Sequence, residues 1–170
     1  NAAIAVAAVE AFTDHALPAE LVADVLGRMR SPGRLEVVGH QPLVVLDGAH
    51  NVAGAEAFAR AMTEEFAPAP RTYVVGLLRE KDPAEMLAAL GVGGAERLVC
   101  CAPPSTRARD PEELAAAARA LGLDPGRVEV VHDVDDAIEH ARAITGPDGQ
   151  ILVTGSLYVV GAARRFLGVG

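Results

Sequence analysis

The residues best suited to binding a ligand lie in one short string, Asp47-Gly48-Ala49-His50-Asn51. The string follows the apolar run 42–46, and a helical pattern begins directly after it. This order is typical of a strand in an open α/β sheet, which binds ligands where its strands end. We expect the Asp47 carboxylate to leave the apolar interior and face a crevice, with Gly48 allowing a tight turn and Asn51 capping the helix. Taken alone, the Asp-Gly pair could be an ordinary turn and His50 a surface histidine.

Three further apolar runs are followed by polar groups. Arg79 and Lys81 come after one of them, where they either meet an anion or form a solvated loop with Asp82 as a helix cap. The polar loop 101–107 is either substrate-facing or merely exposed. Ser156 follows the last run. Its hydroxyl is either a simple helix cap or part of an anion site, since both occupy the start of a helix.

Two common phosphate-binding patterns do not occur in the sequence. There is no G-x-x-x-x-G-K-[ST] string, so this chain does not cradle a triphosphate by itself as P-loop enzymes do. The glycine-rich stretch 91–94 follows a helical pattern and lacks the G-x-G-x-x-G spacing. The five histidines are scattered and no serine lies in a nucleophile-elbow pattern. We therefore expect no catalytic residue acting within this chain alone.

A metal site is not expected either. Asp136 and His140 would share one helix face, but Asp133 is better explained as the cap of that helix, and acidic residues in a first turn favour the helix dipole. Cys100 and Cys101 are neighbours on an apolar run and have no cysteine partners elsewhere. We expect two reduced thiols that point to opposite faces of a sheet.

The composition agrees with an aliphatic α/β core. Hydrophobic residues make up 51% of the 170 residues, yet there are only two Tyr, four Phe and no Trp. Such a core is built from Val, Leu, Ile and Ala, the usual filling of parallel sheets covered by helices. The net charge of −8 argues against a general partner among nucleic acids or membrane surfaces. No run approaches the roughly 20 apolar residues of a membrane span, and we expect a cytoplasmic protein.

Strand and helix patterns alternate along the chain, with short connections. This alternation predicts an α/β fold, a doubly wound, mostly parallel six-stranded Rossmann-like sheet. The expected strands are 35–38, 42–46, 72–77, 97–101, 127–131 and 149–154, and the expected helices are 53–66, 82–90, 110–121, 134–144 and 157–167.

The first residues form a separate region. An apolar stripe of Ile4, Ala8 and Phe12, with Val9 one turn on, predicts a helix, and a second helix starts at Pro18. The chain opens in a helix-favouring run without an initiator methionine, which leads us to expect an upstream domain. The second helix ends at Ser31-Pro32-Gly33-Arg34, which is expected to form a linker or hinge. The expected organisation is therefore a helical region at 1–30, a linker or hinge at 31–34, and a Rossmann-like domain at 35–170.

Four motifs in the same order resemble the C-terminal domain of folylpolyglutamate synthase/dihydrofolate synthase, a family of the Mur ligase superfamily. They are the opening Asn1-Ala2-Ala3-Ile4-Ala5, the Asp47–Asn51 string, the loop 76–82, and Gly155-Ser156-Leu157-Tyr158 after Thr154. The family's linker and first strand are similar to 32–36. Two departures are Val52, where the family usually has Pro, and Glu80, where it has Asp.

The resemblance implies an ATP-dependent ligase that adds L-glutamate to a folate or dihydropteroate carboxylate through an acyl phosphate. Asn1, Arg34 and Asp47 match ATP-binding residues of the family, and His50 and Ser156 match residues on the glutamate and acyl-phosphate side. The expected cofactors are ATP and Mg²⁺, with the metal ligands and the phosphate loop in the upstream ATPase domain. That domain is the expected partner, and this chain alone should be inactive. By the same resemblance, residues 1–30 are expected to be the helical end of the upstream ATPase domain, and residues 35–170 a C-terminal Rossmann-like ligase domain.

Two other functions stay open at this stage. One is a muramyl-peptide ligase domain, against which the Gly-Ser-Leu-Tyr ending argues. The other is a non-catalytic small-molecule binding module, which would also lack a P-loop and a nucleophile. The sequence does not distinguish folate from dihydropteroate as the substrate.

Overall fold

The computed structural model describes residues 2–29 and 31–169. They form two compact units, Asn1–Pro32 and Gly33–Gly170, each of which is described by itself. The boundary between the units falls inside the linker expected at 31–34. Asn1, a predicted ATP-binding residue, lies outside the described residues.

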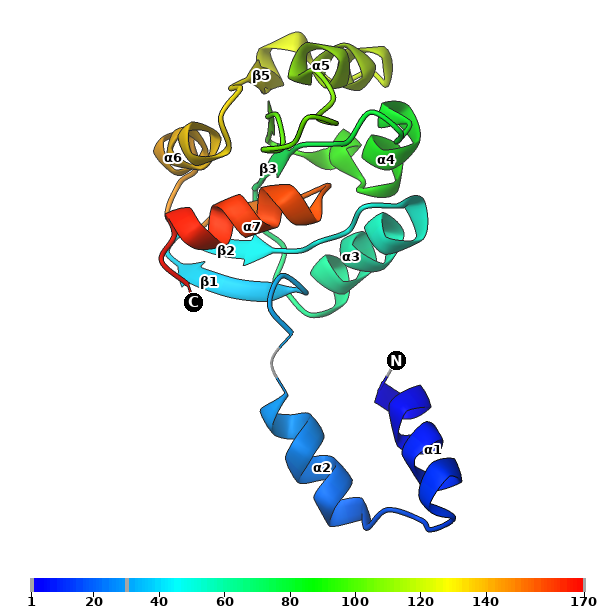
Figure 1. Ribbon diagram of the computed structural model, residues 1–170. Helices are drawn as coiled ribbons and strands as arrows, with labels where there is room; N and C mark the ends of the chain where they lie inside the picture. The colour runs from blue at the N-terminus through cyan, green and yellow to red at the C-terminus, as the bar shows by residue number, and fades with distance from the viewer. Residues whose placement is uncertain (1, 30, 170) are drawn as a thin grey trace. The chain divides into compact units, whose positions relative to one another are not determined.

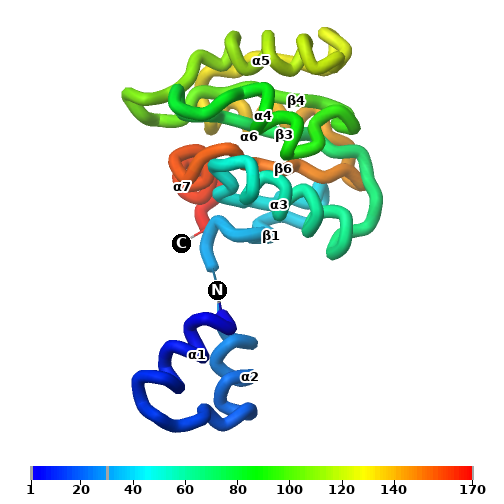
Figure 2. Tube along the Cα trace, turned by 90° about the vertical axis from the view of Figure 1, so that its right-hand side faces the viewer, coloured from blue at the N-terminus to red at the C-terminus, as the bar shows by residue number. Residues whose placement is uncertain are grey.

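The larger unit is built on a six-stranded sheet with the order β1-β2-β6-β3-β4-β5, part of which can be followed in Figure 2. The strands are β1 (Glu36–His40), β2 (Leu43–Leu46), β3 (Arg71–Val75), β4 (Arg97–Cys100), β5 (Val128–Val130) and β6 (Gln150–Thr154). Neighbouring strands from β2 to β5 pair in parallel. The predicted doubly wound, mostly parallel sheet is therefore confirmed.

The exception is β1, which pairs with β2 in the antiparallel sense. Only Gln41 and Pro42 separate the two strands, and a parallel pair needs a crossover of a dozen or more residues. The first two strands are therefore a hairpin, and the helix-connected parallel pattern starts at β2.

Helices cover both faces of the sheet, as Figure 1 shows. α3 (Val52–Glu64), α4 (Pro83–Ala89) and α5 (Pro111–Ala120) lie on one face, and α6 (Val134–Ile144) and α7 (Leu157–Phe166) on the other. Two short 3₁₀ helices, η1 (Val92–Gly94) and η2 (Pro125–Arg127), complete the elements of this unit. The chain steps outward from β2 to β5 and then returns to place β6 between β2 and β3. Right-handed crossovers in the two directions put helices on opposite faces.

Each face has its own apolar core, made mainly of aliphatic side chains. Cys100 belongs to one core and Cys101 to the other, and both thiols are free, as expected. Burial raises the pKa of the Cys100 thiol to about 12 and that of Cys101 further still. Buried, protonated thiols are poor nucleophiles, so these cysteines contribute packing and no chemistry.

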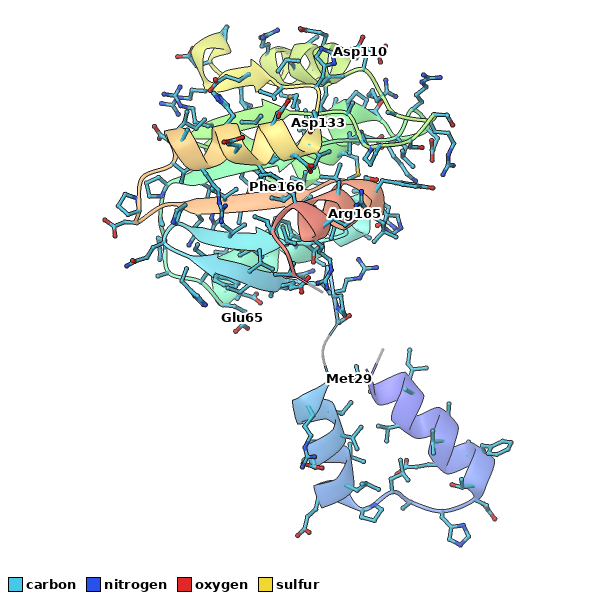
Figure 3. The ribbon with its side chains drawn as sticks, turned by 60° about the vertical axis from the view of Figure 1, so that its left-hand side comes forward. Met29, Glu65, Asp110, Asp133, Arg165 and Phe166 are labelled. Atoms are coloured by element: carbon cyan, nitrogen blue, oxygen red, sulfur yellow. The ribbon has the colours of Figure 1, made fainter. Side chains whose placement is uncertain are left out.

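The helices on both faces start at side-chain caps. Asn51, Asp82, Asp133 and Ser156 each accept a hydrogen bond from a backbone N–H in the first turn, as predicted, and Asp110 does the same for α5. Asp110 and Asp133 are labelled in Figure 3, at the starts of α5 and α6. These caps fix where each loop after a strand ends.

The smaller unit consists of α1 (Ala2–Thr13) and α2 (Ala19–Arg28). An apolar groove of about 270 Å³ lies between them, lined by Ala2, Ala5, Val6, Val9, Leu17, Leu21, Val22, Val25, Leu26 and Met29. The predicted stripe differs from this pattern: Val9 lines the groove, whereas Ile4 and Phe12 are 71% and 92% exposed. No helix among residues 2–29 and 31–169 is both long and apolar enough to cross a membrane.

Candidate functional site

A cleft of about 320 Å³ lies at the carboxyl edge of the sheet. It is bordered by the segments that follow β2, β3, β4 and β6, and its lining residues are His50, Leu78, Glu80, Lys81, Arg107, Gly155, Ser156, Leu157 and Tyr158. β6, the last strand in the chain, lies between β2 and β3 at this point. Such a change in strand order opens a crevice in doubly wound sheets.

His50 enters the cleft from the turn after β2. Its Nδ1 lies 2.8 Å from the Gly48 carbonyl oxygen, which requires Nδ1 to carry the proton. In the tautomer with this proton, Nε2 is the nitrogen left to accept from a ligand. A Cβ at Gly48 would lie 2.5 Å from Leu157 Cδ2, so a larger residue there would displace the end of this exposed leucine side chain.

Ser156 enters from the start of α7. Its hydroxyl accepts a hydrogen bond from the Tyr158 N–H at 3.1 Å and is buried, so the cap interpretation is confirmed. The same residue lines the cleft, and its hydroxyl hydrogen remains able to donate. Gly155 makes the turn possible with a φ of +99°, since a Cβ there would lie 2.8 Å from the Gly76 carbonyl oxygen.

Two cations lie on the opposite border of the cleft. Lys81 and Arg107 line it, and Arg107 also contacts Glu80 at 3.3 Å. Arg79 does not line the cleft: its Nε donates to the Ala108 carbonyl at 2.9 Å. Arg79 and Lys81, both in the loop after β3, therefore have different surroundings.

Arg109 fastens together the two loops that carry these cations. Its Nη2 donates to the carbonyl oxygens of Arg79 at 2.6 Å and Lys81 at 2.8 Å, while its Nη1 pairs with Glu113. An isolated β-bridge between Leu78 and Ala108 adds to the connection. The segments bearing Lys81 and Arg107 thus form one hydrogen-bonded border.

Asp47 lies away from the cleft lining. Its side chain is buried, with Oδ1 accepting from the Ala49 N–H and Oδ2 from the Leu35 N–H, both at 2.8 Å. The expectation that this carboxylate faces an open crevice is therefore wrong in its geometry. The carboxylate turns back because two backbone N–H groups at the strand end need an acceptor.

Arg34 precedes Leu35, whose N–H donates to the Asp47 carboxylate. It is exposed, and its Nη1 lies 3.6 Å from where a Cβ on Gly48 would be. Its guanidinium makes no hydrogen bond to any other residue that the structure describes. The turn at Gly48 therefore has both Arg34 and the cleft-lining Leu157 beside it.

Metal ligation finds no support in the described part of the chain, where no group of three or more His, Cys, Asp or Glu side chains could hold an ion. His140, once considered as a ligand, instead pairs with Glu129 at 2.6 Å. Of the cleft residues, sequence reasoning selected His50 and Ser156 and weighed Lys81, but it missed Arg107 and Tyr158 as individual site residues.

Comparisons with known proteins identify the class to which the chain belongs. Residues 33–157 match the family described as "Mur ligase, glutamate ligase domain", and the chain belongs to that family. The predicted membership of the Mur ligase superfamily is confirmed.

Particular relatives point to one branch of it. The chain is 35% identical to the dihydrofolate synthase/folylpolyglutamate synthase of Mycobacterium tuberculosis, over 99% of this chain and 38% of that protein. A structure of the M. tuberculosis folylpolyglutamate synthase complexed with ADP superposes with a TM-score of 0.87, at 34% identity, over 95% of this chain and 38% of that one. A Yersinia pestis folylpolyglutamate synthase/dihydrofolate synthase complexed with AMPPNP and Mn gives 0.81, at 26% identity, over 95% and 37%.

The chain is short beside these proteins. It spans between 16% and 38% of the length of the curated relatives it matches. The resemblance to the folylpolyglutamate synthase C-terminal domain stated from the sequence is supported by both kinds of comparison.

Proposed function

We propose that this chain is the C-terminal part of an ATP-dependent ligase that adds L-glutamate to the carboxylate of a folate or dihydropteroate. The observation that carries the proposal is the cationic cleft at the strand ends, in a chain of the glutamate ligase domain family. The relatives named folylpolyglutamate synthase, and the ADP and AMPPNP complexes among them, support ATP as the second substrate.

The cleft is suited to an amino acid with two carboxylates. Its volume of about 320 Å³ is at the lower end of ligand pockets, which span roughly 300–1,000 Å³. Lys81 and Arg107 offer positive charge on one border, where Glu80 offsets one of the two charges, and the N-terminus of α7 with the Ser156 hydroxyl offers donors on the other. This local charge contrasts with the net −8 of the chain.

His50 Nε2 is the acceptor among these donors. We propose that it orients the amine of the incoming glutamate, because Nδ1 is already held by the Gly48 carbonyl. In the reaction, the γ-phosphoryl group of ATP is transferred to a carboxylate oxygen of the acceptor, giving ADP and an acyl phosphate. The glutamate nitrogen then attacks the acyl carbon, phosphate leaves with the C–O electron pair, and the amide forms as the nitrogen loses its proton.

Arg34 and Asp47 are proposed on the ATP side of the site. An exposed guanidinium beside the strand-end turn is able to stabilise charge on the transferring phosphoryl group. Asp47 supports this by holding the Leu35 N–H, next to Arg34 in the chain. A direct ATP contact of Asp47, and the predicted contact of Asn1, stay predictions.

The remaining components are proposed to lie outside this chain. Mg²⁺ would be held by an upstream ATPase domain, since the described residues offer no cluster of ligands for it. Residues 1–30 would be the helical end of that domain, which is supported by the apolar side chains lining the groove between α1 and α2. A cytoplasmic location also stays a prediction.

The test is ADP release by the complete protein that contains this chain, measured with and without L-glutamate and a folate or dihydropteroate, beside the same assay on the 170-residue chain. We expect release only from the complete protein and only with both substrates present. Release that requires a muramyl peptide instead would favour the peptidoglycan ligases, and no release with either acceptor would favour a binding module.

A further inference from the structure

The turn that carries Arg34 is hydrogen-bonded on both sides of that residue. The Gly33 N–H donates to Glu36 Oε2 at 2.7 Å, and the Gly33 carbonyl accepts from the Gly48 N–H at 2.7 Å. On the other side, the Leu35 N–H donates to Asp47 Oδ2 at 2.8 Å. Arg34 is therefore an exposed side chain on a fixed piece of backbone.

The backbone of this turn has an unfavourable conformation. Gly33 has a φ of +68° and Leu35 a φ of +45°, both in the left-handed region, which a leucine seldom occupies. Leu35 packs against one of the apolar cores, and Gly33 fits because a Cβ there would lie 2.7 Å from Val160 Cγ1. The surrounding contacts must hold such a turn in place.

Glu36 is the centre of these contacts. While Oε2 accepts from Gly33, Oε1 accepts from Arg164 in the last turn of α7, and both side chains of this pair are mostly buried. Burial alone would raise the pKa of Glu36, but the hydrogen bonds from Arg164 and Gly33 outweigh it and leave the pKa lowered. The carboxylate therefore stays ionised and serves two donors at once.

We propose that Glu36, held by Arg164, is a positioning residue that sets the direction of Arg34 in the ligase reaction. The inference rests on the proposed function, in which Arg34 meets the transferring phosphoryl group. It also gives α7 two tasks, because the helix that begins with Ser156 in the cleft holds the turn through Arg164 near its end.

The first test needs no activity. Glu36→Gln leaves one side-chain oxygen for two donors, so it should speed amide hydrogen exchange of Gly33 and Leu35 at least tenfold in the 170-residue chain, measured by NMR. The matched control is Glu129→Gln on the edge strand β5. It removes the charge of another half-buried carboxylate, which is paired with His140 of α6. Exchange of β3 amides should stay unchanged in both variants, which excludes global loss of stability.

The second test is a double-mutant cycle in the complete protein. Arg34→Ala should lower kcat tenfold or more, Glu36→Gln should lower it in the same direction, and the double variant should match Arg34→Ala, because Glu36 acts only through Arg34. Unchanged exchange in Glu36→Gln, or additive losses of kcat, would overturn the proposal. A normal kcat in Arg34→Ala would instead contradict the phosphoryl role of Arg34 in the proposed function, and the exchange result would stand apart from it.

Discussion

Asp47 and Lys81 both follow a buried parallel strand at the same edge of the sheet, yet their surroundings are opposite. Asp47 is 8% exposed, and each of its oxygens accepts from a backbone N–H of the adjoining turns. Lys81 is half-buried and lines the cleft, with its backbone rather than its ammonium group tied down by Arg109. The Asp47 carboxylate is satisfied inside the fold, whereas the Lys81 ammonium group is available at the cleft.

A charged residue after a strand therefore has one of two roles, which look alike in a sequence. Around Asp47, the carboxylate accepts from nearby backbone N–H groups, and these hydrogen bonds hold the turn that carries Arg34. Around Lys81 and Arg107, hydrogen bonds to backbone groups fix the loops and leave charged ends at the cleft. We expect substitutions in the first region to change stability and the phosphoryl step, and substitutions in the second to change recognition of the amino acid.

The largest effect on stability is expected from Asp47→Ala. It leaves the N–H groups of Leu35 and Ala49 without their acceptor, at about 1–3 kcal/mol for each buried donor. Urea unfolding of the 170-residue chain measures it. Asp82→Ala, which removes an exposed helix cap, is the control and should cost about 1 kcal/mol. An equal or smaller loss for Asp47→Ala would remove the distinction between the two regions.

Gly155→Ala should come next, at about 1–3 kcal/mol. It combines a left-handed backbone with a Cβ 2.8 Å from a backbone oxygen that cannot easily move. The matched control is Gly122→Ala, which has a φ of +91° but open space around the Cβ. Each substitution changes the free energy of unfolding, and the difference between the two changes isolates the steric part. Equal changes would show that the backbone around Gly155 is not closely packed.

The smallest expected effect is a pH dependence at Glu36. Its pKa in the folded chain lies below the ordinary 4.5, so the carboxylate contributes stability that is full above about 4.5 and is lost as the pH falls through the folded pKa. The stability difference between the unsubstituted chain and Glu36→Gln should therefore shrink from pH 7 to pH 3. A difference that stayed constant over this range would contradict the charge-based account of the turn.

The fold and part of the site could be predicted because they depend on local patterns. Alternating apolar runs and capping residues defined the strands and helices, and strand ends marked where His50 and Ser156 would lie. The role of Asp47 could not be predicted, since its partner Leu35 lies twelve residues away in a turn with left-handed backbone. Arg107 was missed because its place beside the cleft depends on Arg109 joining two loops separated by about thirty residues.

The most direct test of the central claim is the KM for L-glutamate of the complete protein carrying Lys81→Met. Methionine keeps an unbranched side chain without the charge, and a lost charge-assisted hydrogen bond of about 1.5–3 kcal/mol corresponds to a rise of at least tenfold. We predict that rise, with the KM for ATP and the free energy of unfolding unchanged. An unchanged KM for L-glutamate would contradict the assignment of the cleft to the amino acid.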